Sequence, residues 1–137
     1  EIAFICPETD YSAEIRAAGI RLIPWVLQRQ TAPVWDELRS IRALYKIYQA
    51  EKPDLVHHFT IKPVLYGSLA ARLAGIPAVV NSITGRGYVF QTISGKVSLL
   101  RLLIERMFIL VYKGLNVGTT FENEDDELFF IESGLIP

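Results

Sequence analysis

The sequence has one cysteine, Cys6, among 137 residues, and its formal net charge is only −1. A single cysteine allows no disulfide within the chain, so a reducing, cytoplasmic compartment is the default expectation. A net charge near zero provides no basic field, which argues against a protein that binds nucleic acid. No group of Cys, His and Asp has metal-ligand spacing, and we expect no metal ion.

Long hydrophobic runs are missing as well. No stretch reaches the roughly 18 to 20 apolar residues of a spanning helix, and no basic leader with a cleavage site precedes Glu1. Half of the residues are nevertheless hydrophobic, which is enough for the core of one domain. The chain starts without Met in a strand-like run and stops at Pro137, where a strand-to-loop exit begins, so we expect both ends to be truncated.

Short apolar runs alternate with segments of helical periodicity along the whole chain. The pattern predicts strands at residues 2–6, 20–25, 55–59, 78–82 and 115–121, and helices at 12–18, 33–52, 63–74, 96–113 and 123–133. Nearly continuous apolar strands separated by helices are typical of a parallel sheet. We therefore expect an α/β fold, a Rossmann-like open parallel sheet with helices on both faces.

Ligands of such folds bind beyond the carboxyl ends of the strands, which directs attention to a glycine loop after the strand at 78–82. This loop contains Thr84, Gly85, Arg86 and Gly87, and we expect loop structure from 83 to 95. The third glycine of a dinucleotide fingerprint is missing and no helix is expected directly behind the loop, so an NAD site is disfavoured. Two interpretations remain: a plain turn, or a cleft wall whose side chains and backbone N–H groups bind a phosphate or a sugar.

The strand at 55–59 contains two consecutive histidines, His57 and His58. Consecutive strand residues point to opposite faces, so at most one of them is expected to serve a site. Lys62 follows just before Pro63, where a helix N-terminus and its dipole favour an anion; a solvated lysine is the alternative. The acidic run 122–127 is better explained as a helix start, because Asn123 is a good N-cap and acids in the first turn complement the helix dipole.

The helix expected at 96–113 has apolar residues on its basic side. Arg101, Arg106 and Lys113 lie opposite the main apolar face, together with Leu102 and Ile109. Such a surface is suited to anionic lipid, and burial against a second domain is the competing interpretation.

Three stretches in series carry a family resemblance: KPDLVH at 52–57, TxKPxxYGSLAARLAGIP at 60–77 and NSITGxGYxF at 81–90. The series resembles the N-terminal, acceptor-side domain of glycosyltransferase family 4 enzymes of the GT-B fold, in the bacterial branch that builds surface polysaccharides. The resemblance covers nearly all of 1–137 and implies that the first strand and the C-terminal donor domain are missing. It further implies metal-independent transfer of a sugar from a nucleotide sugar, bound through the missing domain, to an acceptor that is often a lipid-linked saccharide.

On this basis we expect a glycosyltransferase fragment, inactive alone, at the cytoplasmic face of the membrane as a peripheral protein. The residues expected to line the acceptor cleft are His57, Thr60, Lys62, Thr84, Gly85, Arg86 and Gly87. They would hold polar groups or phosphates of the acceptor, and no catalytic residue is assigned. Two alternatives stay open: a sugar-nucleotide epimerase of the GT-B fold, and a non-catalytic α/β module that binds a membrane or a partner.

Overall fold

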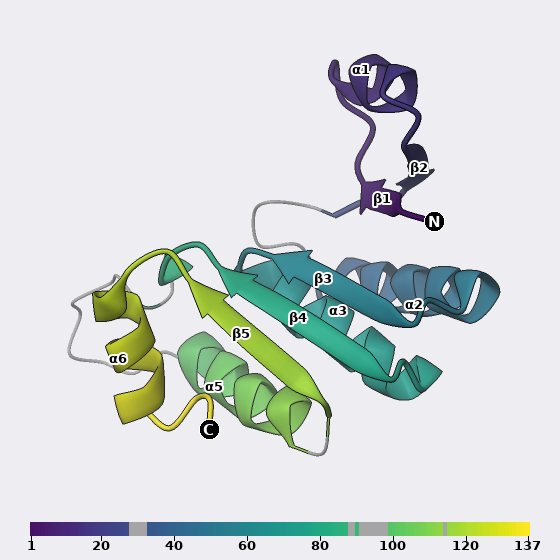
Figure 1. Ribbon diagram of the computed structural model, residues 1–137. Helices are drawn as coiled ribbons and strands as arrows, with labels where there is room; N and C mark the ends of the chain where they lie inside the picture. Colours follow the sequence, from purple (N-terminus) through teal and green to yellow (C-terminus); the bar gives the residue numbers. More distant parts are fainter. Residues whose placement is uncertain (28–32, 88–89, 91–98, 114) are drawn as a thin grey trace.

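The chain alternates strands and helices in a computed structural model that describes residues 1–27, 33–87, 90, 99–113 and 115–137 (Figure 1). The elements are β1 (Ala3–Cys6), α1 (Ser12–Ala17), β2 (Arg21–Pro24), α2 (Val34–Glu51), β3 (Leu55–Phe59), α3 (Ile61–Ala74), β4 (Ala78–Ile83), α5 (Leu99–Tyr112), β5 (Val117–Phe121) and α6 (Glu124–Glu132). The predicted α/β class is confirmed, and the predicted helices and strands match to within a few residues.

All strand pairs are parallel, but they form two sheets. β1 pairs with β2, and β4 pairs with β3 on one side and β5 on the other. α2, α3 and α5 lie on one face of the three-stranded sheet (Figure 1). On the other face, Leu55, His57 and Phe59 of β3 are exposed, because alternate strand residues point to opposite faces.

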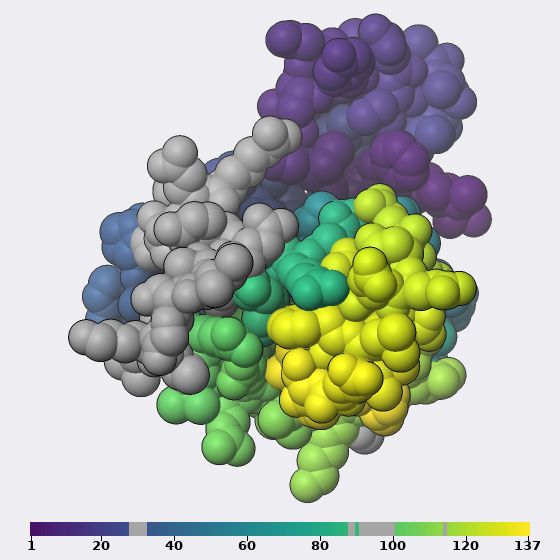
Figure 2. Space-filling view, turned by 90° about the vertical axis from the view of Figure 1, so that its left-hand side faces the viewer, coloured from purple at the N-terminus to yellow at the C-terminus, as the bar shows by residue number. Residues whose placement is uncertain are grey.

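Residues 1–27 form a lobe that stands apart from the rest of the molecule (Figure 2). Trp25 connects the lobe to α2, because its buried indole Nε1 donates to the carbonyl oxygen of Ser40 at 3.0 Å. The Ser40 hydroxyl donates in turn to the carbonyl oxygen of Val26 at 2.9 Å. Arg21 at the start of β2 donates to Glu51 at the end of α2, at 2.9 Å.

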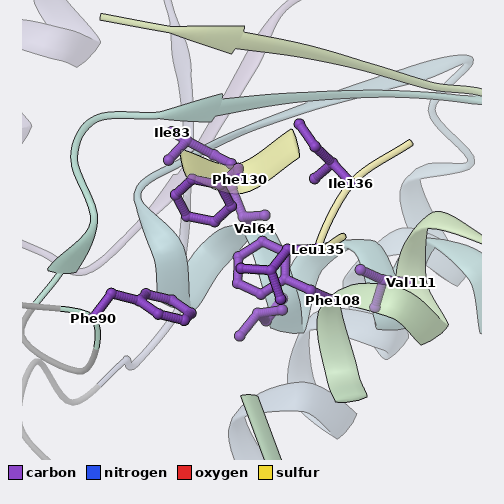
Figure 3. Close-up of a cluster of buried hydrophobic side chains, with 9 residues drawn as sticks. Val64, Ile83, Phe90, Phe108, Val111, Phe130, Leu135 and Ile136 are labelled. Atoms are coloured by element: carbon purple, nitrogen blue, oxygen red, sulfur yellow. The ribbon is translucent and has the colours of Figure 1, made fainter. Parts of the chain in front are cut away.

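The core beneath the three-stranded sheet is rich in aromatic residues (Figure 3). Phe108 of α5 and Phe130 of α6 are fully buried, and their ring centroids are 5.3 Å apart in an edge-to-face arrangement. They pack against Val64 of α3 and Ile83 of β4. Edge-to-face rings of this kind add about 0.5–1.5 kcal/mol beyond the burial of their area. α6 is therefore fixed to the same face of the sheet as α3 and α5.

The helix ends follow the expected local chemistry. Gly75 ends α3 with φ 73°, a left-handed conformation that glycine adopts without strain. Asn123 caps α6: its side-chain oxygen accepts from the backbone N–H of Asp126 at 2.8 Å, so the predicted cap is confirmed.

One expectation about the segment behind the glycine loop needs correction. We expected loop structure from 83 to 95, but Ile83 belongs to β4 and Phe90 is helical. Phe90 is buried and packs with Phe108 and Phe130 in the aromatic core. Residues 88–89 and 91–95 of the expected loop lie outside the described part of the chain.

Candidate functional site

The loops after β3 and β4 meet at the carboxyl edge of the sheet. The backbone N–H of Thr60 donates to the carbonyl oxygen of Ser82 at 3.0 Å. Gly87 lies so close to the first turn of α3 that a methyl group in place of its hydrogen would sit 3.4 Å from Ile61. The glycine loop predicted from the sequence and the start of α3 therefore form one surface, in which the side chains of Thr60 and Thr84 are exposed.

Thr60 has an unusual backbone conformation, with φ 71° and ψ 159°. This region of φ/ψ space is essentially restricted to glycine and costs other residues about 1–3 kcal/mol. The Thr60 side chain does not cap α3, although it occupies the N-cap position. The carbonyl oxygen of Thr60 accepts from the backbone N–H of Val64 at 3.0 Å, so the contact of Thr60 with the helix start is made by its backbone. Its exposed hydroxyl group lies at the rim of the site.

Replacing Thr60 with glycine is expected to raise the free energy of unfolding by about 1 kcal/mol, because relief of strain exceeds the added chain entropy of glycine. Urea titration tests this, followed through the fluorine resonance of 5-fluorotryptophan at the buried Trp25. Thr60→Ala is the control, since alanine retains the strained backbone and should bring no gain. A gain with alanine as large as with glycine would show that the backbone is not strained.

Lys62 contacts an acid instead of facing open solvent. Its ammonium group lies 2.7 Å from a carboxylate oxygen of Glu37 in the first turns of α2. Lys62 also lies 5.8 Å from the ring centroid of Tyr66, one turn further along α3. Burial raises the pKa of Tyr66, and its hydrogen bond to Glu37 raises that pKa further. Glu37 thus takes one of the three N–H donors of the Lys62 ammonium group.

Arg86 is the most strongly held residue of the glycine loop. Its Nε donates to Asp126 at 2.6 Å and its Nη2 donates to the carbonyl oxygen of Asp125 at 3.0 Å. The guanidinium carbon lies 4.7 Å from the ring centroid of Phe129, a cation–π distance. The other oxygen of the buried Asp126 carboxylate accepts from the Asn123 side chain at 3.0 Å. Arg86 thus fastens the glycine loop to the start of α6.

His57 lies on the exposed face of the sheet, two residues before the end of β3. Its Nε2 is 2.7 Å from the Ser82 hydroxyl, which lies 2.7 Å from the hydroxyl of Thr120 on β5. The imidazole also stacks on Phe59, with ring centroids 4.2 Å apart. His57 is therefore part of a polar row across three strands, set back from the surface formed by Thr60 and the glycine loop.

His58 points to the opposite, buried face, as the strand alternation predicted. Its Nδ1 lies 2.8 Å from Asn81 Oδ1 and its Nε2 lies 2.8 Å from the Tyr48 hydroxyl. The amide nitrogen of Asn81 donates to Ser68, so Oδ1 is the atom that accepts from His58. Nδ1 therefore carries the proton and Nε2 accepts from Tyr48, which fixes a neutral tautomer.

Burial is the main cause that lowers the pKa of His58 to about 4, against a partial opposing effect of its hydrogen bond to Asn81. Burial likewise raises the pKa of Tyr48, which keeps its hydroxyl a donor. The network continues to Tyr112, whose hydroxyl lies 2.9 Å from Thr119 on β5. His58 thus stabilises the core and does not reach the site.

The three basic residues predicted to face a membrane divide into two groups. Arg101 is half-buried: its Nε donates to Glu105 at 2.8 Å and its guanidinium lies 5.8 Å from the Phe90 ring centroid. Arg106 and Lys113 are exposed. They share the outer side of α5 with Leu102, Leu103, Ile109 and Leu110, which are 42–58 % exposed.

Other possible sites lie elsewhere or have no support among the described residues. A surface hollow of about 360 Å³ lies at the opposite, amino edge of the sheet, between residues 52–54 and 74–77. Within the described ranges, no group of three or more His, Cys, Asp or Glu side chains is placed to hold a metal ion. Of the helices that the structure describes, none has the length and apolarity needed to cross a membrane.

Sequence reasoning singled out two loops that the structure brings together, but it missed the residues that orient their basic side chains. Glu37 and Asp126 hold Lys62 and Arg86 from elements 25 and 40 residues away, and no local pattern signals such pairs. Ser82 could have been found from the sequence, because a parallel pairing of β3 with β4 places it opposite Phe59 and beside His57.

A parallel α/β sheet whose adjacent loops converge at its carboxyl edge defines a domain of the Rossmann-like class. The sequence profile of the family described as "Glycosyl transferase 4-like" matches residues 1–112, and the chain therefore belongs to this family.

Two characterised proteins are similar to nearly the whole chain. The chain is 34 % identical to a UDP-Gal:alpha-D-GlcNAc-diphosphoundecaprenol alpha-1,3-galactosyltransferase of Escherichia coli over 130 residues, which is 93 % of this chain and 32 % of that protein. It is 25 % identical over 135 residues to an N,N'-diacetylbacillosaminyl-diphospho-undecaprenol alpha-1,3-N-acetylgalactosaminyltransferase of Campylobacter jejuni, covering 98 % of this chain and 36 % of that protein. The chain spans about a third of the length of these relatives.

Proposed function

We propose that the protein containing this chain transfers a sugar from a nucleotide sugar to a lipid-linked saccharide during synthesis of a cell-surface polysaccharide. The observation that carries this proposal is the match of nearly the whole chain to two transferases whose names specify undecaprenol-diphosphate acceptors. Both names also specify transfer of a galactose-type sugar to a saccharide carrying that lipid. The family resemblance further supports a reaction that needs no metal ion.

In this proposal the chain is the acceptor-side half of a GT-B enzyme, and a second domain binds most of the donor. The presence of two separate parallel sheets supports the proposal that a strand is missing from this chain. β1 and β3 each have an edge without a described partner. The unpaired N–H and C=O groups at such an edge can pair with a further strand. A parallel strand between β1 and β3 would join the two sheets into one.

The site binds and positions the acceptor, with no nucleophile among its described residues. Thr60 and Thr84 offer hydroxyl groups at the carboxyl edge, which would donate to phosphate oxygens and either donate to or accept from hydroxyls of the acceptor. Lys62 and Arg86 mainly position the two loops of the site, because each already has a carboxylate partner. Binding energy used in this way raises the rate by holding the acceptor hydroxyl in line with the donor.

The acceptor's lipid also calls for contact with a membrane surface. The exposed side of α5 combines four large apolar residues with Arg106 and Lys113. Apolar residues mixed with cations suit the headgroup region of an anionic bilayer. We therefore place the protein at the cytoplasmic face of the membrane as a peripheral protein.

The transfer reaction is tested with the full-length protein, radiolabelled UDP-sugars and an undecaprenyl-diphosphate-linked saccharide. The expected product is the lipid-linked saccharide extended by one sugar, formed equally well with a chelator present, and residues 1–137 alone should form none. A new nucleotide sugar formed without acceptor would identify an epimerase instead. The absence of both products would leave a non-catalytic module and overturn the proposal.

Arg86→Ala is expected to lower kcat/KM of this transfer about tenfold, because the glycine loop loses its attachment to α6. Asp126→Ala should lower it by a similar factor, since it removes the same contact from the other side. Arg16→Ala is the matched control: Arg16 pairs with Glu8 on the exposed surface of the N-terminal lobe. If Asp126→Ala left kcat/KM unchanged, Arg86 would act on the substrate directly and not through the loop.

A further inference from the structure

The exposed face of the three-stranded sheet changes in chemical character from its amino end to its carboxyl end. The helices α2, α3, α5 and α6 pack on the opposite face (Figure 1). At the amino end of the exposed face, Leu55 lies beside Ala78 and both are apolar. At the carboxyl end, the register places Phe59 beside Ser82 and Ser82 beside Thr120. Residues paired in this way share a face, so an aromatic ring and two hydroxyl groups form a row across the three strands.

His57 joins this row through its side chain. Its Nε2 lies 2.7 Å from the Ser82 hydroxyl, which lies 2.7 Å from the Thr120 hydroxyl. The imidazole also stacks on the Phe59 ring, and 55 % of Phe59 is still exposed. Thr120 is exposed at the end of this hydrogen-bonded series, where its hydroxyl can take a further partner. We refer to His57, Phe59, Ser82 and Thr120 as the sheet platform.

The chemistry of the sheet platform suits a neutral sugar ring. The electron-rich face of an aromatic ring attracts the C–H bonds on one side of a sugar, whereas sugar hydroxyls need partners that both donate and accept. Neighbouring strands lie about 4.8 Å apart, so the row from Phe59 to Thr120 is about 10 Å long, comparable with a pyranose ring and its hydroxyl groups. None of the four side chains is a carboxylate, an ammonium or a guanidinium group, which a charged ligand would require as its partner.

We propose that the sheet platform binds a pyranose ring of the acceptor saccharide, with the C–H side of the sugar on Phe59 and its hydroxyl groups on Ser82 and Thr120. Phe59 directly precedes Thr60, whose backbone N–H donates to the carbonyl oxygen of Ser82 at 3.0 Å. The sheet platform therefore adjoins the surface formed by Thr60 and the glycine loop. His57 is a positioning residue, because it acts on the sugar through the Ser82 hydroxyl. The inference rests on the proposed function for the identity of the saccharide, but sugar binding is measurable without transfer.

Sugar binding is tested without catalysis by saturation-transfer difference NMR on the full-length protein. The probe is methyl N-acetyl-α-glucosaminide, which contains the sugar named in the acceptor of the Escherichia coli relative. Saturation of the protein's aromatic protons is expected to reach the ring protons of the sugar. Phe59→Ala should reduce these sugar signals at least fivefold, and Phe59→Tyr, which keeps an aromatic ring, less than twofold.

Leu55→Ala is the matched control for Phe59→Ala. Leu55 lies on the same strand and the same face, and it is 53 % exposed against 55 % for Phe59. This substitution should change the sugar signals less than twofold. Both side chains are exposed, so the two variants should unfold at similar temperatures, which separates a loss of sugar binding from a loss of fold.

Transfer kinetics of the full-length protein separate the acceptor from the donor sugar. With a short-chain lipid-linked acceptor, Phe59→Ala is expected to raise the KM for the acceptor about tenfold and to change kcat and the KM for the UDP-sugar less than twofold. Thr120→Val removes a hydroxyl group, keeps the shape of the side chain and should raise the KM for the acceptor about fivefold. Thr120→Ser keeps the hydroxyl group and should raise it less than twofold.

Unchanged sugar signals in Phe59→Ala, or equal effects of Phe59→Ala and Leu55→Ala, would overturn the inference and assign this face to contact with another part of the protein. A rise confined to the KM for the UDP-sugar would also overturn it, because the sheet platform would then bind the donor. Failure of the proposed function gives a different result. In that case the unaltered protein would transfer no sugar, while binding of the methyl glycoside would still depend on Phe59.

Discussion

Replacing Gly67 with alanine is expected to lower the free energy of unfolding by about 3 kcal/mol. Gly67 on α3 faces the His58 ring so closely that an added methyl group would overlap it and lie 2.8 Å from its Cε1 atom. Overpacking in a core typically costs about 1–3 kcal/mol. Here the ring cannot move freely, because Tyr48 and Asn81 hold both of its nitrogens. Displacement would therefore also break buried hydrogen bonds, which places the cost at the upper end.

The measurement is urea unfolding followed through the fluorine resonance of Trp25, which packs in the same cluster as Tyr48. Gly118→Ala on β5 is the matched control, because an added methyl group there meets nothing within 4 Å. It should leave the free energy of unfolding unchanged or slightly higher. A cost below 1 kcal/mol for Gly67→Ala would mean that α3 can move away from the sheet. Should Gly67→Ala not fold, Gly67→Ser combined with His58→Ala should fold better than Gly67→Ser alone.

The small residues of α3 show how much of the fold the sequence predicts. Their helical spacing predicted close contact of α3 with a sheet, and Ala70 and Ala71 are fully buried. The spacing did not reveal what the glycine accommodates. His58 comes from β3 and Asn81 from β4, so the contact depends on the parallel register of two strands. Local periodicity is thus readable from the sequence, whereas side-chain partners far apart in the chain are not.

The candidate site shows the same limit. The position of Thr84, Gly85, Arg86 and Gly87 after a strand followed from the pattern of the chain, and the structure places that loop beside Thr60. The partner of Arg86 did not follow, because the acidic run at 122–127 was explained well by helix capping alone. In fact Asp126 does both: its backbone N–H is capped by Asn123, and its carboxylate accepts from Arg86.

The buried His58 also predicts a loss of stability in acid. Its pKa is lowered to about 4 in the folded state, mainly by burial, against about 6.5 in the unfolded chain. Between these values the unfolded chain binds a proton at this position and the folded chain does not. Stability therefore rises with pH in this window, and the contribution is fully present above pH 6.5. As the pH falls from 6.5 to 4, about 3 kcal/mol is lost, because each unit of pKa difference corresponds to about 1.4 kcal/mol.

Other groups also titrate in this range, so the prediction concerns a difference between variants. His58→Gln cannot take up a proton, and its deficit in unfolding free energy relative to the unaltered protein should shrink by about 2 kcal/mol between pH 7 and pH 4.5. Carboxylates common to both proteins cancel in this comparison. A deficit of His58→Gln that stays constant with pH would show that the buried histidine takes up its proton without unfolding. In that case the hydrogen bonds to Tyr48 and Asn81 would have to accommodate the charged ring.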